Sequence, residues 1–178
     1  CCSYLGSPVF FKENELIVIN GSRPSNYSLE SYSCRGVSAD SPDGLCTVND
    51  VLYYKSNDGI YAYSGSRPRC VSQDLGDGIR GLKKAVLGGE GDMLFVSGEY
   101  MGESVHYSYD TLRGIWHGYT SPPTVNYVNL GGITLEFCKD DGKYTLRSLY
   151  SAERAEEVLE NAEKLEKEWF FETGDMFY

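Results

Sequence analysis

A Ser or Cys catalytic triad needs a histidine as its base, and the chain has two histidines, His106 and His117. Neither stands in a catalytic motif: His106 falls within a predicted strand, and His117 follows Trp116 at the end of another. A lone histidine of this kind is more often structural than catalytic. The run Gly88-Gly89-Glu90-Gly91 lacks the lysine of a phosphate loop and is interpreted as a glycine turn. The sequence therefore predicts no catalytic residue and no cofactor-binding residue.

Carboxylates are abundant, with 26 Asp and Glu residues, and glycosidases work with a converging pair of them. The sequence does not bring any two of these acids together. Asn57-Asp58-Gly59 and Asp140-Asp141-Gly142 have the residue types of tight hairpin turns. Because the alternating ligands of a calcium loop are absent, we expect turns here and no metal site.

The six cysteines show no CxxC pair and no histidine at zinc-finger spacing. They are Cys1, Cys2, Cys34, Cys46, Cys70 and Cys138. No secretory signal precedes them, and this context predicts unpaired, buried thiols. The triplet Asn26-Tyr27-Ser28 matches a glycosylation acceptor, a pattern that also arises by chance.

The formal net charge is -10, so the mean field of the chain repels nucleic acids and anionic membranes. The local basic cluster Arg80, Lys83 and Lys84 is offset by Asp74 and Asp77 upstream and is expected to be a solvated loop. No apolar run approaches the ~18 residues that span a bilayer. We therefore expect neither a nucleic-acid nor a membrane partner.

Composition and repetition together predict the fold. The chain has 15 Tyr, 7 Phe and 20 Gly, a mixture typical of strands and turns. The tetrapeptide GSRP occurs at residues 21–24 and again at 65–68, each time after a strand-like run, at 16–19 and at 60–63. Such self-similarity is typical of repeat architectures.

Four units follow from this repeat, at a spacing of roughly 42 residues, with Phe11, Tyr54, Phe95 and Phe137 taken as equivalent positions. Each unit has the pattern of antiparallel hairpins with rather apolar faces, which need cover on both sides. Blades stacked around an axis provide that cover, whereas a sandwich has no such longer repeat. The predicted fold is all-β: a β-propeller-like repeat of about four antiparallel sheet units, as an incomplete ring or a piece of a larger one. The alternative is an irregular β-domain whose apparent repeat is fortuitous.

Residues 1–150 form the predicted repeat domain, and residues 151–178 differ from it. Ser151 is a good N-cap, and apolar residues then recur at helical spacing, which predicts a helix over residues 152–167. A strand over residues 169–173 would begin a further β-element.

Three segments resemble a known class of proteins. They are LYYKSNDGIYAYSG at residues 52–65, Tyr109-Asp110 leading to Trp116, and WFFETG at residues 169–174. Together they resemble propeller-type structural proteins encoded in tailed bacteriophages and prophages of Gram-positive bacteria. The resemblance implies a place in the virion, in the tail or head-to-tail region, assembled in the cytoplasm of the bacterial host.

The preferred hypothesis is a non-catalytic virion structural protein that binds other virion proteins or itself. One alternative is a carbohydrate-binding propeller that recognises a bacterial surface glycan through exposed tyrosines. In strands, however, tyrosines more often pack between blades. A third hypothesis, a polysaccharide hydrolase or lyase, needs two converging carboxylates.

Overall fold

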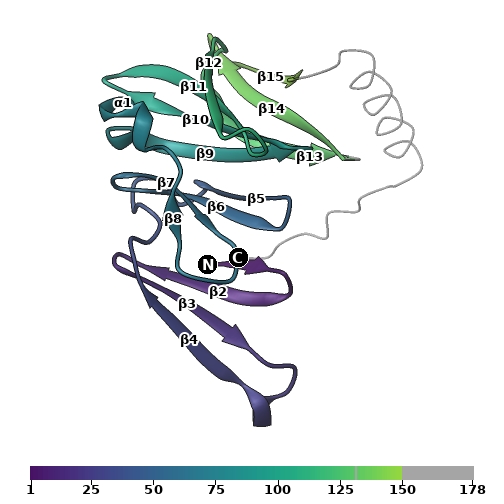
Figure 1. The fold of residues 1–178 in the computed structure, drawn as a ribbon. Helices are drawn as coiled ribbons and strands as arrows, with labels where there is room; N and C mark the ends of the chain where they lie inside the picture. The colour runs from purple at the N-terminus through teal and green to yellow at the C-terminus, as the bar shows by residue number, and fades with distance from the viewer. Residues whose placement is uncertain (131, 150–178) are drawn as a thin grey trace, which may run out of the picture.

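The computed structural model describes residues 1–130 and 132–149, which form four antiparallel sheets in chain order (Figure 1). Sheet 1 contains β1 (Cys2–Tyr4), β2 (Ser7–Lys12), β3 (Glu15–Asn20) and β4 (Ser28–Ser33). Sheet 2 contains β5 (Leu45–Val48), β6 (Val51–Ser56), β7 (Gly59–Tyr63) and β8 (Arg69–Cys70). Sheet 3 contains β9 (Lys83–Glu90), β10 (Met93–Tyr100), β11 (Glu103–Asp110) and β12 (Ile115–Tyr119). Sheet 4 contains β13 (Thr124–Leu130), β14 (Ile133–Asp140) and β15 (Lys143–Ser148).

Within every sheet, strands that follow one another in the chain are hydrogen-bonded neighbours. Short helical segments lie in some of the connections between strands. The segments are η1 (Pro24–Asn26), η2 (Gln73–Leu75) and α1 (Asp77–Arg80). The all-β prediction is confirmed, and so is the prediction of four antiparallel sheet units.

Two-residue turns join successive strands within the sheets and fix the register of the hairpins. Both turn residues have positive φ at Leu5-Gly6, Asn49-Asp50, Met101-Gly102 and Asp141-Gly142. This backbone matches the right-handed twist of antiparallel strands. The hairpin turns predicted at residues 57–59 and 140–142 are both confirmed, since Ser56 pairs with Gly59 and Asp140 pairs with Lys143.

The repeat is visible in the topology. Both GSRP copies follow the third strand of a sheet, β3 or β7, and lead toward the fourth strand. The second strands, β2, β6, β10 and β14, contain the four aromatic residues that the sequence pattern aligned.

The equivalence of those aromatic residues is wrong for Tyr54 and for Phe95. Counted from the first hairpin turn of each sheet, Phe95 corresponds to Val9 and lies two positions before the place of Phe11. Phe11 and Tyr54 lie on opposite faces of their strands, and their rings meet between sheets 1 and 2 at a centroid distance of 4.9 Å. Alignment on the two-residue turns places Lys55, not Tyr54, at the position of Phe11. A shift of one residue moves a strand side chain to the other face of the sheet.

Successive sheets pack face to face and bury two apolar layers. Between sheets 1 and 2 lie Val9, Leu16, Val18, Leu52, Tyr54 and Tyr63. Between sheets 2 and 3 lie Tyr53, Ile60, Ala62, Leu87, Leu94 and Val96, joined by Ile79 of α1. Sheet 2 is therefore covered on both faces, as its sequence pattern predicts.

The first strands of neighbouring sheets approach closely at β9, which contacts β5 on one side and β13 on the other. A Cβ atom on Gly88 would lie 2.5 Å from the Tyr127 side chain, and one on Gly89 would lie 2.3 Å from a Val48 methyl. The interpretation of residues 88–91 as a glycine turn is therefore wrong for its first part. Gly88 and Gly89 lie within β9, where the missing side chains let two sheets come near, and Gly91 alone has the positive φ of a turn.

The four sheets form an open stack in the described part of the chain, with sheets 1 and 4 at opposite ends (Figure 1). A closed propeller ring is not present among these residues. The helix and strand predicted within residues 151–178 lie outside the described residues. No helix in the described ranges is both long and apolar enough to cross a membrane.

Replacing Gly89 with Ala tests the close approach at β9. Because the new methyl would clash with Val48, we expect the free energy of unfolding to fall by about 1–3 kcal/mol. In the Val48→Ala background the same change should cost at least about 1 kcal/mol less, because the clashing methyl is gone. Urea denaturation of the four proteins in the cycle measures both quantities.

Gly118→Ala is the matched control. Gly118 also lies in a strand, but the nearest atom to a Cβ at this position would be 4.0 Å away, so we expect a change within about 0.5 kcal/mol. If Gly89→Ala were as mild as Gly118→Ala, the sheets would not be in contact at this point.

Candidate functional site

A buried polar cluster between sheets 3 and 4 brings together side chains of the types that take part in catalysis. Its members are Ser97, His106, Tyr119, Thr124, Tyr127 and Glu136. The register of the strands brings them together: His106 on β11 pairs with Ser97 on β10 and with Tyr119 on β12. Tyr127 on β13 pairs with Glu136 on β14, which faces His106 from the opposite sheet.

Hydrogen bonds tie the carboxylate of Glu136 to its surroundings. Thr124 Oγ1 donates to Oε1 at 2.6 Å, and Ser121 Oγ donates to Oε2 at 2.6 Å. His106 Nδ1 lies 3.7 Å from Glu136 Oε1 and 2.8 Å from Ser97 Oγ. Because the side chains of His106 and Glu136 are each only 2% exposed, the carboxylate is held by protein groups and not by water.

Serine, histidine and glutamate are the residue types of a hydrolase triad, but their geometry here is different. In a triad the acid and the nucleophile contact opposite nitrogens of the imidazole ring. Here both Ser97 and Glu136 approach Nδ1, and Nε2 has no hydrogen-bond partner among the described residues. Ser97 is also fully buried. The cluster joins two sheets and does not have the arrangement of a nucleophilic site.

Burial governs the protonation of the cluster. Desolvation lowers the pKa of His106, and the opposing attraction of Glu136 offsets this only in part. Desolvation also raises the pKa of Tyr119 to about 12 and that of Tyr127 still further. At neutral pH the cluster therefore contains a neutral imidazole and neutral phenols.

The second histidine, His117, is exposed in the middle of β12, not at a strand end as expected. The basic residues Arg80, Lys83 and Lys84 are solvated as expected, but they do not form a loop. Arg80 ends α1 and the two lysines begin β9. Lys84 forms an ion pair with Glu99 at 2.8 Å, which leaves no continuous basic patch here.

All six cysteines are free thiols. The expectation of burial is confirmed for Cys138 and wrong for Cys1, which is exposed, while the other four are partly buried. Burial raises the pKa of Cys46 to about 11, so that this thiol stays protonated and unreactive at neutral pH. No group of three or more metal-ligating side chains gathers among the described residues.

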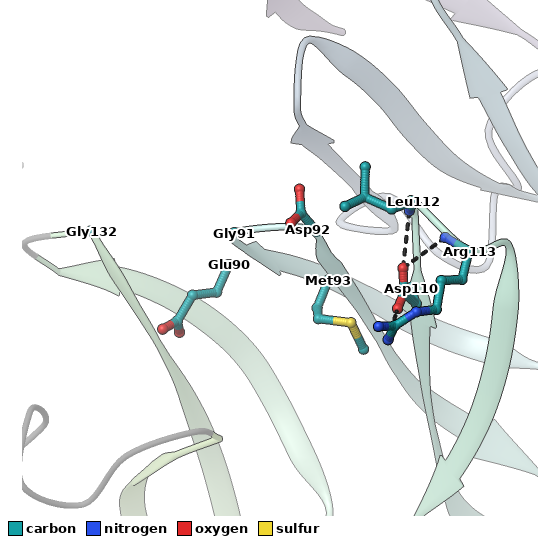
Figure 2. Close-up of a pocket in the computed structure, with 8 residues that line it drawn as sticks. All are labelled: Glu90, Gly91, Asp92, Met93, Asp110, Leu112, Arg113 and Gly132. Atoms are coloured by element: carbon teal, nitrogen blue, oxygen red, sulfur yellow. Dashed lines mark hydrogen bonds and ion pairs between the residues drawn. The ribbon is translucent and has the colours of Figure 1, made fainter.

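An acidic hollow of about 690 Å³ lies where the turns of sheets 3 and 4 meet (Figure 2). Its carboxylates are engaged with the backbone and with neighbouring turns. Glu90 accepts the Thr134 amide at 2.8 Å, Asp92 accepts the Asn49 side-chain amide at 2.7 Å, and Asp110 accepts two amides of its own turn. Figure 2 shows Glu90 on one side of the hollow and Asp110 turned toward Arg113 on the other. These acids hold turns together and do not converge as a glycosidase pair.

Five of the fifteen tyrosines, the residue type considered for glycan stacking, are part of the core. Tyr4, Tyr53, Tyr54, Tyr63 and Tyr109 are each at most 6% exposed. Their rings pack between sheets, as in the Tyr4–Tyr63 contact at 5.2 Å and the Tyr53–Tyr109 contact at 6.2 Å. The packing interpretation is confirmed for these five residues.

The sequence analysis did not identify the outward-facing side of sheet 1, here called the outer face. It carries Pro8, Phe10, Ile17, Ile19 and Leu29, of which Phe10 is 41% and Leu29 is 72% exposed. Phe10 pairs with Ile17 and Ile19 pairs with Leu29, so that the apolar side chains are contiguous across three strands. The sequence could have indicated this surface, because Pro8, Val9 and Phe10 are all apolar and successive side chains of a strand point to opposite faces.

Comparison of the sequence with protein-family models and with curated proteins found no match. The resemblance to phage structural proteins stays a prediction.

Stability should depend on pH through His106. Its folded pKa is below the ordinary value of about 6.5, so the unfolded chain takes up a proton before the folded chain does. The contribution of His106 to the free energy of unfolding is complete above about pH 6.5 and is lost as the pH falls through the pKa of the folded state. We expect His106→Asn to flatten the decline in the free energy of unfolding between about pH 7.5 and pH 5, as measured by urea denaturation.

His117→Asn is the control for this measurement. It makes the same substitution at an exposed position of β12, and the pH dependence of His106→Asn is compared with that of this variant. A slope for His106→Asn equal to that of the wild type would mean that His106 titrates alike in the folded and unfolded chains.

Proposed function

We propose that this chain is a non-catalytic structural protein that acts through protein–protein contacts made by the outer face of sheet 1. The proposal rests on one observation: sheet 1 has apolar residues at the positions that form a buried contact surface in sheet 2. Aligned on their turns, Pro8 and Phe10 of β2 occupy the positions of Leu52 and Tyr54 of β6. In the adjoining strands, Ile17 and Ile19 likewise occupy the positions of Tyr61 and Tyr63.

In sheet 2 these positions form the surface that packs against the preceding sheet. Leu52 and Tyr54 are 0% exposed and Tyr63 is 2% exposed, all in the layer shared with sheet 1. Sheet 1 has apolar residues at the same positions but no preceding sheet in the described structure. Its outer face therefore has the composition of an interface that is covered by another protein surface.

The free energy available from this face is substantial. Complete burial of an exposed Phe, Leu or Ile side chain stabilises by about 1.5–3 kcal/mol. Phe10 and Leu29 are well exposed, and Ile17 and Ile19 are partly exposed. Covering these four side chains would therefore contribute part of this burial free energy for each of them. A contiguous apolar surface of this kind marks an interaction site more often than an accident of sequence.

The wider setting is proposed from the fold and from the sequence resemblance together. Each complete sheet is a four-stranded meander, and the first strands β5, β9 and β13 lie beside one another. We infer that the sheets are successive blades of a β-propeller, of the type encoded by tailed phages, and that the protein belongs to a virion tail or head-to-tail region. The buried cluster around His106 fits a role without catalysis, because its hydrogen bonds join sheets 3 and 4, as between Ser97 and Tyr127.

Site-specific photo-crosslinking tests the proposed function. Benzoylphenylalanine replaces Phe10 in the full chain, which is produced in its natural host and irradiated there. We expect defined crosslinked protein products at Phe10, identified by mass spectrometry, because the outer face is covered by protein in the assembly.

The same photoreactive residue in place of Leu112 is the control. Leu112 is 74% exposed in the turn between β11 and β12, far from the outer face. Equal and diffuse labelling at both positions, or no product at Phe10, would show that the outer face of sheet 1 is not an interface.

A further inference from the structure

The three contacts between neighbouring sheets differ in their chemistry. Sheets 1 and 2 enclose one buried apolar cluster, and sheets 2 and 3 enclose another. The third apolar cluster lies on sheet 4 itself, where it contains Ile133 and Leu135 with Leu130 beside them. Among the described residues, no buried apolar cluster joins sheet 4 to sheet 3. Sheet 4 is therefore attached to the stack in a different way from the other sheets.

Strand β14 turns its polar side toward sheet 3. Thr134 Oγ1 donates to the Gly89 carbonyl at 2.6 Å, and Glu136 faces His106. Cys138 lies on the same side of the strand, because alternate side chains of a strand share a face, and it is 0% exposed. The aliphatic side chains of β14 lie on its other side. This contact of sheets 3 and 4, here called the polar joint, therefore depends mainly on hydrogen bonds.

Tyr127 of β13 supplies further hydrogen bonds to the polar joint. Its hydroxyl bonds to Ser97 Oγ and, at 2.8 Å, to Tyr119 Oη. One aromatic contact accompanies them, between the rings of Tyr127 and Phe95 at a centroid distance of 6.1 Å. Polar groups regain hydrogen bonds to water when two sheets separate, whereas the stabilisation from buried apolar surface is lost. We therefore expect the polar joint to be the weakest of the three contacts.

We propose that sheet 4 is a removable cover: it separates from sheet 3 at the polar joint while sheets 1, 2 and 3 stay packed, and protonation of His106 promotes this opening. Figure 1 shows sheet 4 at one end of the stack, where sheet 3 is its neighbour in the described structure. Opening exposes the side of sheet 3 that carries Val86 and Phe95, which are 6% and 5% exposed in the closed state. Sheet 3 then presents apolar residues, as sheet 1 does on its outer face.

The groups that face His106 determine the direction of the pH effect. Glu136 attracts an imidazolium, whereas Arg147, which pairs with Glu136 across β14 and β15, repels it. The other titratable groups facing it have raised pKa values and are neutral at neutral pH: Tyr119, Tyr127 and Cys138. Burial is the largest effect and lowers the pKa of His106 in the closed joint. An open sheet returns the imidazole to water, where it binds a proton more readily, so acid below about pH 6.5 favours the open state.

Labelling of the Cys138 thiol measures the opening in the full chain. This thiol is buried in the closed polar joint, so dithiodipyridine reaches it only when the joint opens, and mass spectrometry identifies its peptide. The labelling rate, relative to that of the same thiol in the urea-unfolded chain at the same pH, gives the open fraction. Hydrogen exchange gives the corresponding fraction for the amides of β6, an inner strand of sheet 2. We expect the open fraction at Cys138 to exceed that at β6 by about tenfold or more.

Tyr127→Phe tests the polar joint itself. Loss of the hydroxyl removes the hydrogen bonds to Ser97 and Tyr119, so we expect the open fraction at Cys138 to rise about threefold to tenfold. Tyr144→Phe is the matched control, because Tyr144 belongs to the same sheet, is 56% exposed and lies on the side away from sheet 3. The control should leave the open fraction within about twofold of the wild type.

Ile60→Val distinguishes opening of sheet 4 from unfolding of the whole stack. Ile60 is 0% exposed in the apolar cluster between sheets 2 and 3, a contact that stays intact when sheet 4 alone opens. We expect this change to raise the open fraction at β6 about threefold or more and to leave that at Cys138 within about twofold. Acid should raise the open fraction at Cys138 about twofold or more between pH 7.5 and pH 5.5, and His106→Asn should reduce this rise.

Each part of the proposal has a result that would overturn it. If Cys138 and β6 open equally, or if Ile60→Val raises both open fractions alike, sheet 4 leaves only when the whole stack unfolds and is not a cover. Equal effects of Tyr127→Phe and Tyr144→Phe would show that the hydrogen bonds of the polar joint do not hold sheet 4. A pH response that is unchanged in His106→Asn would exclude His106 as the group that promotes opening.

Discussion

Sheets that are apolar on both faces are the constraint on which the rest of this structure depends. Strand β6 is buried along almost its whole length, with Tyr54 facing sheet 1 and Tyr53 facing sheet 3. A sheet of this kind is not stable alone in water and needs a neighbour on each side. Once sheet 2 has this composition, the chain must place one sheet before it and one after it. The stacked order of sheets 1, 2 and 3 follows directly.

The distance between neighbouring sheets depends on which side chains are absent as much as on which are present. Stacked sheets normally lie about 10 Å apart, separated by interdigitating side chains. At β9, Gly88 and Gly89 remove those side chains on both faces, and Tyr127 and Val48 occupy the space. The turns then come within hydrogen-bonding reach, as in the contact of Asn49 with Asp92. Closely packed first strands and short turns thus join sheets 2, 3 and 4 at β5, β9 and β13.

The parts of the fold that depend on local pattern could be predicted from the sequence. Alternating apolar strands, Asp-Gly turns and the repeated GSRP tetrapeptide predict four antiparallel sheets, and the structure has four. The face assignment of Tyr54 could not be predicted, because a one-residue shift in alignment leaves the hydrophobic pattern almost unchanged when both faces are apolar. The polar cluster was also missed. His106 and Glu136 lie far apart in the chain and meet only because two sheets pack together, a long-range contact that no local spacing encodes.

One repeat position shows how strongly the packing partner decides the residue type. Counted from the first hairpin turn of each sheet, Phe10, Tyr54 and Glu136 occupy the same place in the second strands of sheets 1, 2 and 4. Tyr54 is buried against apolar side chains, and Glu136 is buried where Ser121 and Thr124 donate hydrogen bonds to it. Strand geometry therefore does not require an aromatic residue at this place, since a carboxylate also fits when its neighbours are polar. The presence of Phe10, together with Ile17 beside it, fits the proposal that another apolar surface covers the outer face of sheet 1.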